Sequence, residues 1–197
     1  TVELTWNARN QLTGVWTNGE LAAEFGYDPL GRQAWLFDGA ATNYMVYDGL
    51  HLVADVDAAG APIRTYQYGP GIDANQSMTV HTGATPRTYY HLRDHLNTVR
   101  ALADENGSLV ETYDYEAWGG VTIRDAAGQI LPASALGNRL LFQGREQLPG
   151  TSLLQFRARW YDAATGRWLS PDPRGVSAGV NSYAAFADNP ACKADPT

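Results

Sequence analysis

The chain has 197 residues and a formal net charge of −7, because 21 acidic residues outnumber 14 lysines and arginines. This acidity argues against a nucleic-acid-binding protein, whose affinity rests on clustered basic residues. The sequence contains no apolar run long enough to span a bilayer, and its single Cys192 can form neither an intrachain disulfide nor a thiolate metal cluster.

The first residues, from Thr1 to Trp6, already alternate as a strand does, without a start methionine or a targeting segment. The last residues contain Asp195-Pro196, a pair that normally begins a turn. We therefore expect the chain to be a segment of a longer polypeptide. Its sheet would have unpaired edges at both ends, so we expect full stability to require the parent chain or a partner.

A short turn of the form Asp-x-x-Gly recurs between runs rich in Tyr, Trp and Val. An aspartate at the first turn position can accept hydrogen bonds from backbone N–H groups two or three residues on, and glycine supplies the positive φ that closes the turn. Such turns connect the strands of antiparallel hairpins. Copies of this turn include Asp28–Gly31, Asp57–Gly60, Asp125–Gly128 and Asp172–Gly175.

The segments between these turns alternate with the period of a β-strand. Between residues 107 and 115, Glu111 and Tyr113 share one face, while Thr112 lies on the other. The stretch from Leu131 to Leu141 is the best helical candidate, but its proline and glycine limit it to a short turn. The sequence therefore predicts an all-β fold in which antiparallel hairpin repeats form one continuous sheet.

A histidine pair, His91 and His95, flanks Asp94 and suggests a metal site. Four residues of extended strand separate the two side chains by roughly 13 Å, too far for one zinc ion unless a bulge intervenes. We therefore favour histidines paired with sheet carboxylates or with the backbone. No phosphate-binding loop or Ser-His-Asp order stands out, and we expect no cofactor.

Several ordered motifs resemble those of the RHS/YD-repeat proteins. Residues 26–32, Gly-Tyr-Asp-Pro-Leu-Gly-Arg, are similar to the YD repeat, and residues 89–97 resemble the histidine signature of the RHS core with one residue added. The resemblance implies a large sheet that spirals into a hollow shell, with YD-repeat hairpins at 1–88 and the RHS repeat-associated core segment at 89–197. The remaining core motifs are Phe142–Glu146, Arg157–Asp162, Gly166–Trp168, Ser170–Pro173, Asn181–Tyr183 and Asn189–Pro190.

In function, the resemblance implies a structural shell segment that encapsulates a C-terminal toxin domain. Its partners would be the rest of its own shell and that cargo domain, with other copies of the chain or secretion-apparatus proteins as further candidates. Nucleic acid and a membrane span are not expected. The localisation implied is secreted or on the bacterial cell surface.

The resemblance also implies that the core cuts its own chain once, through an aspartate pair. The matching residues are Asp172 and Asp195, with Arg159 as a cation that would fix the orientation of a carboxylate. Two carboxylates held close share one proton, so one of them can activate a water. In the family, the cut follows an Asp-Pro-x-Gly-Leu motif, which places it beyond Thr197.

Two structural readings compete with this chemistry: Asp172 can be one more turn former, and Arg159 can pair with Asp162 or another sheet carboxylate. Two departures from the motif also affect the geometry. Ala185 replaces an aromatic residue and leaves less packing, and Asp188 adds a third carboxylate.

A further alternative is a cell-surface adhesion, carbohydrate-binding or extracellular assembly module without toxin cargo. The many Tyr and Trp side chains could stack on sugars, although we favour them as the packed inner wall of the shell.

Overall fold

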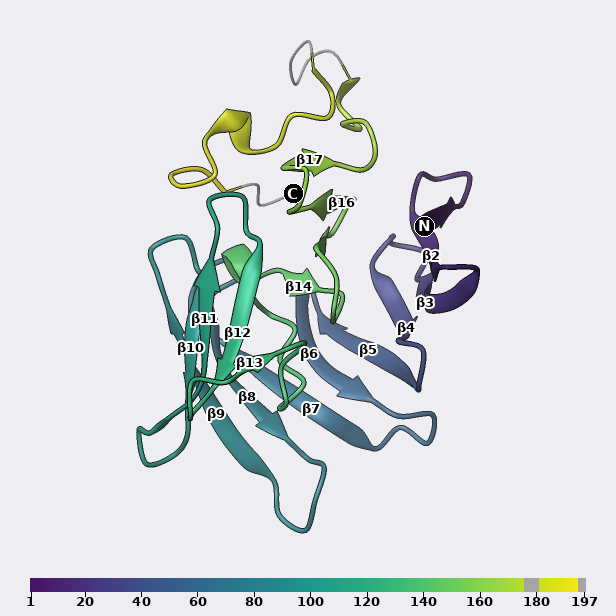
Figure 1. The fold of residues 1–197 in the computed structure, drawn as a ribbon. Helices are drawn as coiled ribbons and strands as arrows, with labels where there is room; N and C mark the ends of the chain where they lie inside the picture. Colours follow the sequence, from purple (N-terminus) through teal and green to yellow (C-terminus); the bar gives the residue numbers. More distant parts are fainter. Residues whose placement is uncertain (176–180, 195–197) are drawn as a thin grey trace.

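The computed structural model describes residues 1–175 and 181–194. Its regular structure is nearly all antiparallel β-sheet, which confirms the predicted all-β fold (Figure 1). A 13-stranded sheet, here called the wall, is a simple meander in which every strand pairs with its neighbours in sequence. The strands of the wall are β1 (Val2–Trp6), β2 (Leu12–Thr17), β3 (Glu20–Tyr27), β4 (Gln33–Phe37), β5 (Thr42–Asp48), β6 (His51–Val56), β7 (Pro62–Tyr68), β8 (Asn75–Val80), β9 (Arg87–Arg93), β10 (Val99–Ala103), β11 (Leu109–Tyr115), β12 (Val121–Asp125) and β13 (Ile130–Leu131).

A second, four-stranded sheet follows the wall in sequence. Together with its flanking loops, described at residues 138–175 and 181–194, it is called the plug. Its elements are η1 (Phe142–Gly144), β14 (Glu146–Gln147), β15 (Leu153–Phe156), β16 (Arg159–Asp162), β17 (Arg167–Trp168) and η3 (Phe186–Asp188).

The hairpin turns of the wall follow the predicted chemistry. At Asp57, the backbone oxygen accepts the N–H of Gly60 at 3.0 Å, and Gly60 has φ of 80°. The Asp57 carboxylate accepts the N–H groups of Ala59 and Ala61, both at 2.9 Å. The carboxylate therefore accepts a hydrogen bond from the fourth residue after the aspartate, one residue further than predicted. The bulge that follows the turn brings the N–H of that residue back over the carboxylate.

A tyrosine at the end of a strand recurs as a second internal tie. In three repeats its hydroxyl donates to the backbone oxygen of the first or second residue in the preceding strand, which fixes the register at that end of the hairpin. The three bonds are Tyr27 to Leu12 at 2.7 Å, Tyr68 to Leu52 at 3.0 Å and Tyr115 to Val99 at 2.8 Å.

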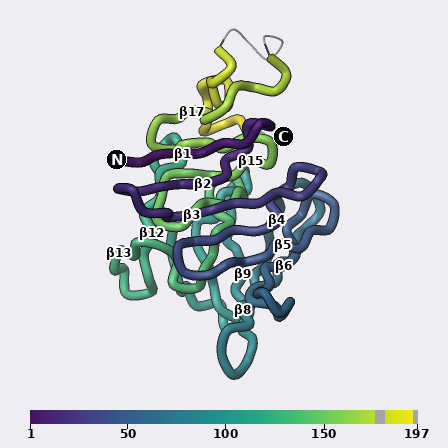
Figure 2. The backbone as a smooth tube through the Cα atoms, turned by 90° about the vertical axis from the view of Figure 1, so that its right-hand side faces the viewer, coloured from purple at the N-terminus to yellow at the C-terminus, as the bar shows by residue number. Residues whose placement is uncertain are grey.

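The wall bends so that β2–β4 and β10–β13 lie on opposite sides of β14 of the plug (Figure 1). In the perpendicular view, β1 and β2 pass in front of the plug (Figure 2). Buried wall residues such as Leu102 form one hydrophobic core with Leu141 and Trp160 of the plug. The ring centroids of Phe25 and Trp160 are 4.8 Å apart. The plug is therefore part of the core of the wall.

A smaller aromatic cluster holds the plug itself together. The Phe186 ring lies 5.1 to 5.8 Å from the centroids of Phe156, Tyr161 and Trp168. Ala185, predicted to weaken packing here, is fully buried in this cluster. The neighbouring phenylalanine therefore supplies aromatic packing that residue 185 itself cannot supply.

Three further predictions concern a possible helix, the division of the chain and a membrane span. The stretch from Leu131 to Leu141 contains turns and no helix, as predicted. The proposed division between residues 88 and 89 falls inside β9, and it stays a prediction about sequence segments. Within the described ranges, no helix has the length and apolar character needed to cross a membrane.

Candidate functional site

Two of the predicted site residues, Arg159 and Asp172, meet in the plug. Arg159 opens β16, and Asp172 lies in the turn after β17. The Arg159 Nη1 atom is 2.7 Å from Asp172 Oδ2, and both side chains are largely buried, at 6 % and 13 % exposure. The guanidinium also lies 4.1 Å from the centroid of the Trp168 ring. Stacking and the ion pair together fix the orientation of this carboxylate.

The other carboxylate oxygen of Asp172 serves the turn. Asp172 Oδ1 accepts the N–H of Arg174 at 2.8 Å, and its backbone oxygen accepts the N–H of Gly175 at 2.9 Å. Asp172 is therefore both a turn former and the carboxylate partner of Arg159. The alternative partner, Asp162, accepts instead from the hydroxyls of Ser152 and Thr165.

The third predicted residue, Asp195, lies outside the described residues. The extra carboxylate of Asp188 is exposed on η3 and forms no ion pair with any residue that the structure describes.

A buried ion-pair network, which the sequence did not predict, joins the plug to the wall. Asp55 on β6 has no exposed surface. Its carboxylate lies 2.8 Å from Arg139 Nη2 and 2.9 Å from Arg64 Nε, and it accepts from the Tyr66 hydroxyl at 2.8 Å. Arg139 also contacts Glu146 at 3.1 Å. One guanidinium of the plug is thus shared between a carboxylate of the wall and one of β14.

The charges and the burial of this network shift the pKa values of its two carboxyl groups. Burial alone raises the pKa of the Asp55 carboxyl, but the positive charges of Arg139 and Arg64 outweigh burial and hold that pKa below its ordinary value. For Glu146 burial dominates, and its pKa is raised although Arg139 opposes the shift. Asp55 is therefore the charged anchor, and Glu146 is the more easily protonated partner.

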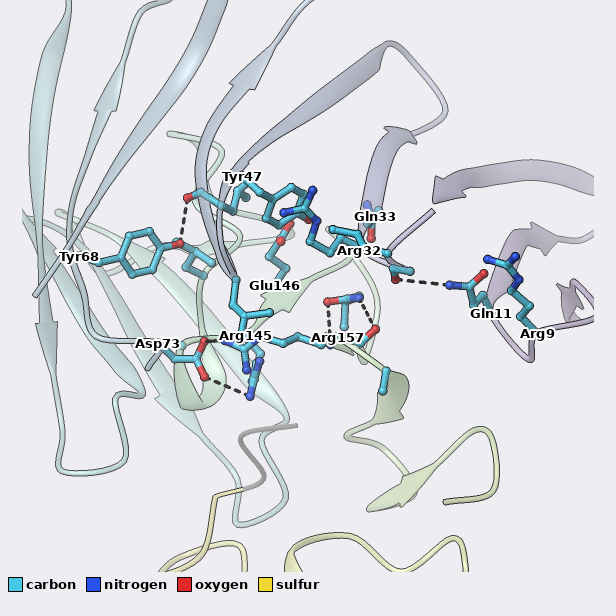
Figure 3. A pocket seen from close by; sticks show the side chains of 18 residues that line it. Arg9, Gln11, Arg32, Gln33, Tyr47, Tyr68, Asp73, Arg145, Glu146 and Arg157 are labelled. Atoms are coloured by element: carbon cyan, nitrogen blue, oxygen red, sulfur yellow. Dashed lines mark hydrogen bonds and ion pairs between the residues drawn. The ribbon is translucent and has the colours of Figure 1, made fainter. Parts of the chain in front are cut away.

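A second link joins the plug to the loop between β7 and β8. Asp73 Oδ2 lies 3.0 Å from Arg145, and Oδ1 lies 2.6 Å from Arg157 (Figure 3). Gly144 packs directly on this loop with φ of 67°, and a Cβ there would meet the Asp73 backbone oxygen at 2.7 Å. Asp73 therefore holds two arginines of the plug on one carboxylate.

An open cavity of about 340 Å³ lies beside Asp73, between the plug and the hairpin turns at one rim of the wall (Figure 3). Gln33 and Tyr47 line it from the wall, and Glu146 and Gln155 line it from the plug. Burial raises the pKa of the Tyr47 phenol far above its ordinary value, so this phenol stays neutral. Neither member of the Arg159–Asp172 pair lines the cavity, so the two sites are separate.

The predicted histidine pair is divided by the structure. His91 is buried on β9, and its Nε2 lies 3.4 Å from Asn138 Oδ1, an amide oxygen rather than the predicted carboxylate or backbone group. Burial lowers the pKa of His91 to about 4. His95 is exposed in the turn that Asp94 forms. Within the described ranges, no three His, Cys, Asp or Glu side chains are grouped to hold a metal ion.

A further buried carboxylate ties the loop that follows β13 to the wall. Glu111, which is 2 % exposed, accepts hydrogen bonds from Tyr113 at 2.6 Å and from Ser134 at 2.7 Å. It also accepts the backbone N–H of Ala135 at 2.8 Å. The alternation of β11 gave a signal for this role, because it placed Glu111 on the same face as buried Tyr113.

Comparison with known proteins fits this architecture. The model of the teneurin YD-shell family matches residues 1–187. The chain belongs to this family. The predicted relationship to RHS/YD-repeat shells is thereby confirmed.

The YD-shell chain is similar to much longer toxin proteins. It is 32 % identical over 201 residues to the tRNA nuclease WapA of Bacillus subtilis strain 168, covering 98 % of this chain and 8 % of the relative. It is 28 % identical over 221 residues to the double-stranded DNA deaminase toxin A of Burkholderia cenocepacia, covering 100 % of this chain and 15 % of the relative. The chain thus spans a small part of these relatives.

Solved structures share the fold of the YD-shell chain. The crystal structure of TcdB2-TccC3 superposes with a TM-score of 0.73 at 20 % identity, over 99 % of this chain and 10 % of that one. The Photorhabdus luminescens Tc holotoxin pore gives a TM-score of 0.71, also at 20 % identity over 99 % and 10 % of the two chains. By its family the chain is a YD-shell segment, and its fold is similar to that of the Tc toxin structures.

Proposed function

We propose that this chain forms the closing end of a hollow YD-shell that encloses a C-terminal cargo domain of the same polypeptide. The observation that carries the proposal is the plug, which packs inside the bend of the wall through a shared core and the buried Asp55–Arg139 ion pair. A wall built only to present a surface has no need of a buried, charge-paired closure. The proposed setting is a secreted or surface-bound bacterial protein.

The closure combines two kinds of contact. Burial of apolar side chains gives most of the stabilisation, since it scales with the area removed from water. The ion pairs of Asp55 and Asp73 give the plug one position, because leaving any of these charges unpaired inside the protein is costly. A plug with a single position can seal a compartment.

We further propose that the plug cuts the chain once, with Arg159 and Asp172 as part of the site and Asp195 as the second carboxylate. The ion pair and the turn hold both oxygens of Asp172 in place. In a pair of this kind, the ionised carboxylate takes a proton from water as the water attacks the peptide carbonyl, and the protonated carboxyl gives its proton to the departing amine. Cleavage would separate the cargo from the shell.

Protease protection of the full-length protein tests enclosure. A domain downstream of residue 197 should resist added protease in the wild type and become sensitive when Asp55→Ala and Asp73→Ala are combined. The matched control is Asp57→Ala, which alters an exposed turn of the wall. A downstream domain digested equally fast in the wild type and the double variant would contradict enclosure.

Mass analysis of the full-length protein tests self-cleavage. We expect a single cut beyond Thr197 that is lost in Asp172→Asn and in Asp195→Asn, and that is slowed in Arg159→Gln. Asp188→Asn, which changes an exposed carboxylate, should be cut normally. An uncut wild type, or normal cutting in Asp195→Asn, would remove this part of the proposal and leave enclosure standing.

A further inference from the structure

The outer face of the wall has an aromatic hollow that the shell function does not use. Strands β3, β4 and β5 turn Phe25, Leu36 and Met45 toward the plug, and each of these side chains is at most 9 % exposed. Because side chains alternate across a strand, the residues between them face outward. A hollow of about 350 Å³ lies on that outward face.

The register of the three strands arranges the outward side chains in two rows. In the first row, Trp35 lies between Gly26 on one side and Tyr44 on the other. In the second row, Phe37 lies between Glu24 and Thr42. Leu21 completes the lining of the hollow.

Gly26 is the residue that opens the hollow. A Cβ on Gly26 would meet the indole nitrogen of Trp35 at 1.9 Å, so the indole lies over the glycine backbone. Trp35 therefore leans toward β3 and away from Tyr44 on β5. Tyr44, left beside the space, is 40 % exposed.

The charges of the hollow favour a cation. Glu24 is exposed and forms no ion pair with any residue in the described ranges. It is the only acidic or basic residue among the six described residues that line the hollow. The faces of aromatic rings carry the negative end of their quadrupole, and the whole chain carries a net charge of −7. Three rings and an unpaired carboxylate are complementary to an organic cation and repel an anion.

We infer that this hollow binds an organic cation of the ammonium class, held over the rings of Trp35 and Tyr44 with Glu24 as its counter-charge. The inference does not depend on enclosure or self-cleavage, because the hollow is on the opposite face of the wall from the plug. It gives the outside of the shell a recognition site of its own.

The test compares two probes that share one shape. Choline carries a trimethylammonium group, and 3,3-dimethylbutan-1-ol is its uncharged carbon isostere. Each is titrated into the ¹⁵N-labelled protein while the indole N–H resonances are followed, and Trp35→Phe identifies the resonance of Trp35. Choline should shift that resonance to saturation, with the isostere binding about two- to fivefold more weakly or worse.

Variants locate the site and separate charge from shape. Tyr44→Ala and Glu24→Gln should each weaken choline binding by about two- to fivefold, and Glu24→Gln should also reduce the preference for choline over the isostere. Val46→Ala is the matched control, because Val46 is exposed on the same strand outside the hollow and its loss should change nothing.

Three outcomes would overturn the inference. They are no shift of the Trp35 resonance with choline, equal binding of the isostere, and choline binding that survives Tyr44→Ala and Glu24→Gln unchanged. A neutral sugar such as cellotetraose that binds more tightly than choline, and equally well to Glu24→Gln, would assign the hollow to glycans instead.

Discussion

Replacement of Asp55 by asparagine is the sharpest test of how the plug is held in the wall. The change keeps the shape of the side chain and an acceptor for the Tyr66 hydroxyl, but it removes the negative charge. Arg139 and Arg64 then lose their shared partner, and Arg139 is only 4 % exposed. Removing one member of a buried ion pair costs about 3–5 kcal/mol of unfolding free energy. Because a typical domain is stable by about 5–15 kcal/mol, this loss is large.

Urea denaturation followed by tryptophan fluorescence measures this loss. Asp57→Asn is the matched control, since Asp57 forms an exposed turn that asparagine can also form, and its cost should stay within about 0.5 kcal/mol. Replacing both Asp55 by alanine and Arg139 by methionine should cost less than the sum of the single changes, because the double variant leaves fewer charges unpaired.

The pH dependence gives an independent check. Arg139 and Arg64 hold the pKa of Asp55 below its ordinary value of 3.8. A carboxyl with a lowered pKa stabilises the fold above that ordinary value, and the contribution is lost as the pH falls through the folded pKa. The gap between wild type and Asp55→Asn should therefore be full at pH 7 and shrink in strong acid. A gap below about 1 kcal/mol at pH 7, or one that grows in acid, would refute the reasoning.

Three further changes probe other parts of the fold. Tyr115→Phe removes the hydroxyl that donates to the Val99 backbone oxygen, so it should cost about 1 kcal/mol in urea denaturation, whereas Tyr44→Phe, which changes an exposed ring, should cost almost nothing. His91→Gln should flatten the dependence of the unfolding free energy on pH. Burial lowers the pKa of His91 from 6.5 to about 4, so the wild type loses about 3 kcal/mol of stability as the pH falls through that window. A variant that loses as much stability as the wild type over the same pH range would contradict this assignment. Gly144→Ala should cost about 2 kcal/mol or more in thermal or urea unfolding, because the positive φ is strained and the new Cβ meets the Asp73 backbone oxygen; an alanine variant as stable as wild type would show that the loop yields freely.

The repeating part of this fold could be predicted because its causes are local. Each Asp-x-x-Gly turn is formed by a carboxylate, a few N–H groups and a glycine within five residues, as at Asp57. Period-two alternation then places the strands and assigns their faces. The meander, the all-β class and the inward position of Glu111 all follow from such short-range patterns.

The contacts of the plug could not be predicted in the same way, because they join residues far apart in sequence. Asp55 pairs with Arg139 84 residues later, and no local rule connects the two. The Arg159–Asp172 contact was anticipated only through family resemblance. A signal for Asp55 did exist: it lies inside a strand between Ala54 and Val56, and a carboxylate that is buried there must find a partner. The sequence alone could not say which arginine that partner would be.

The order of pairing in the wall has a consequence for synthesis on the ribosome. Each strand bonds to the strand made just before it, so every hairpin can form as soon as its second half emerges. The contacts between the plug and the wall, by contrast, join residues far apart in sequence. Trp160 donates to the Tyr27 hydroxyl across 133 residues. Arg145 and Arg157, which pair with Asp73, come more than 70 residues after it. The apolar inner face of the N-terminal strands therefore stays uncovered until the plug has been translated. We therefore expect slow translation across residues 130–160 to lower the yield of folded protein, because it prolongs the exposure of that apolar face.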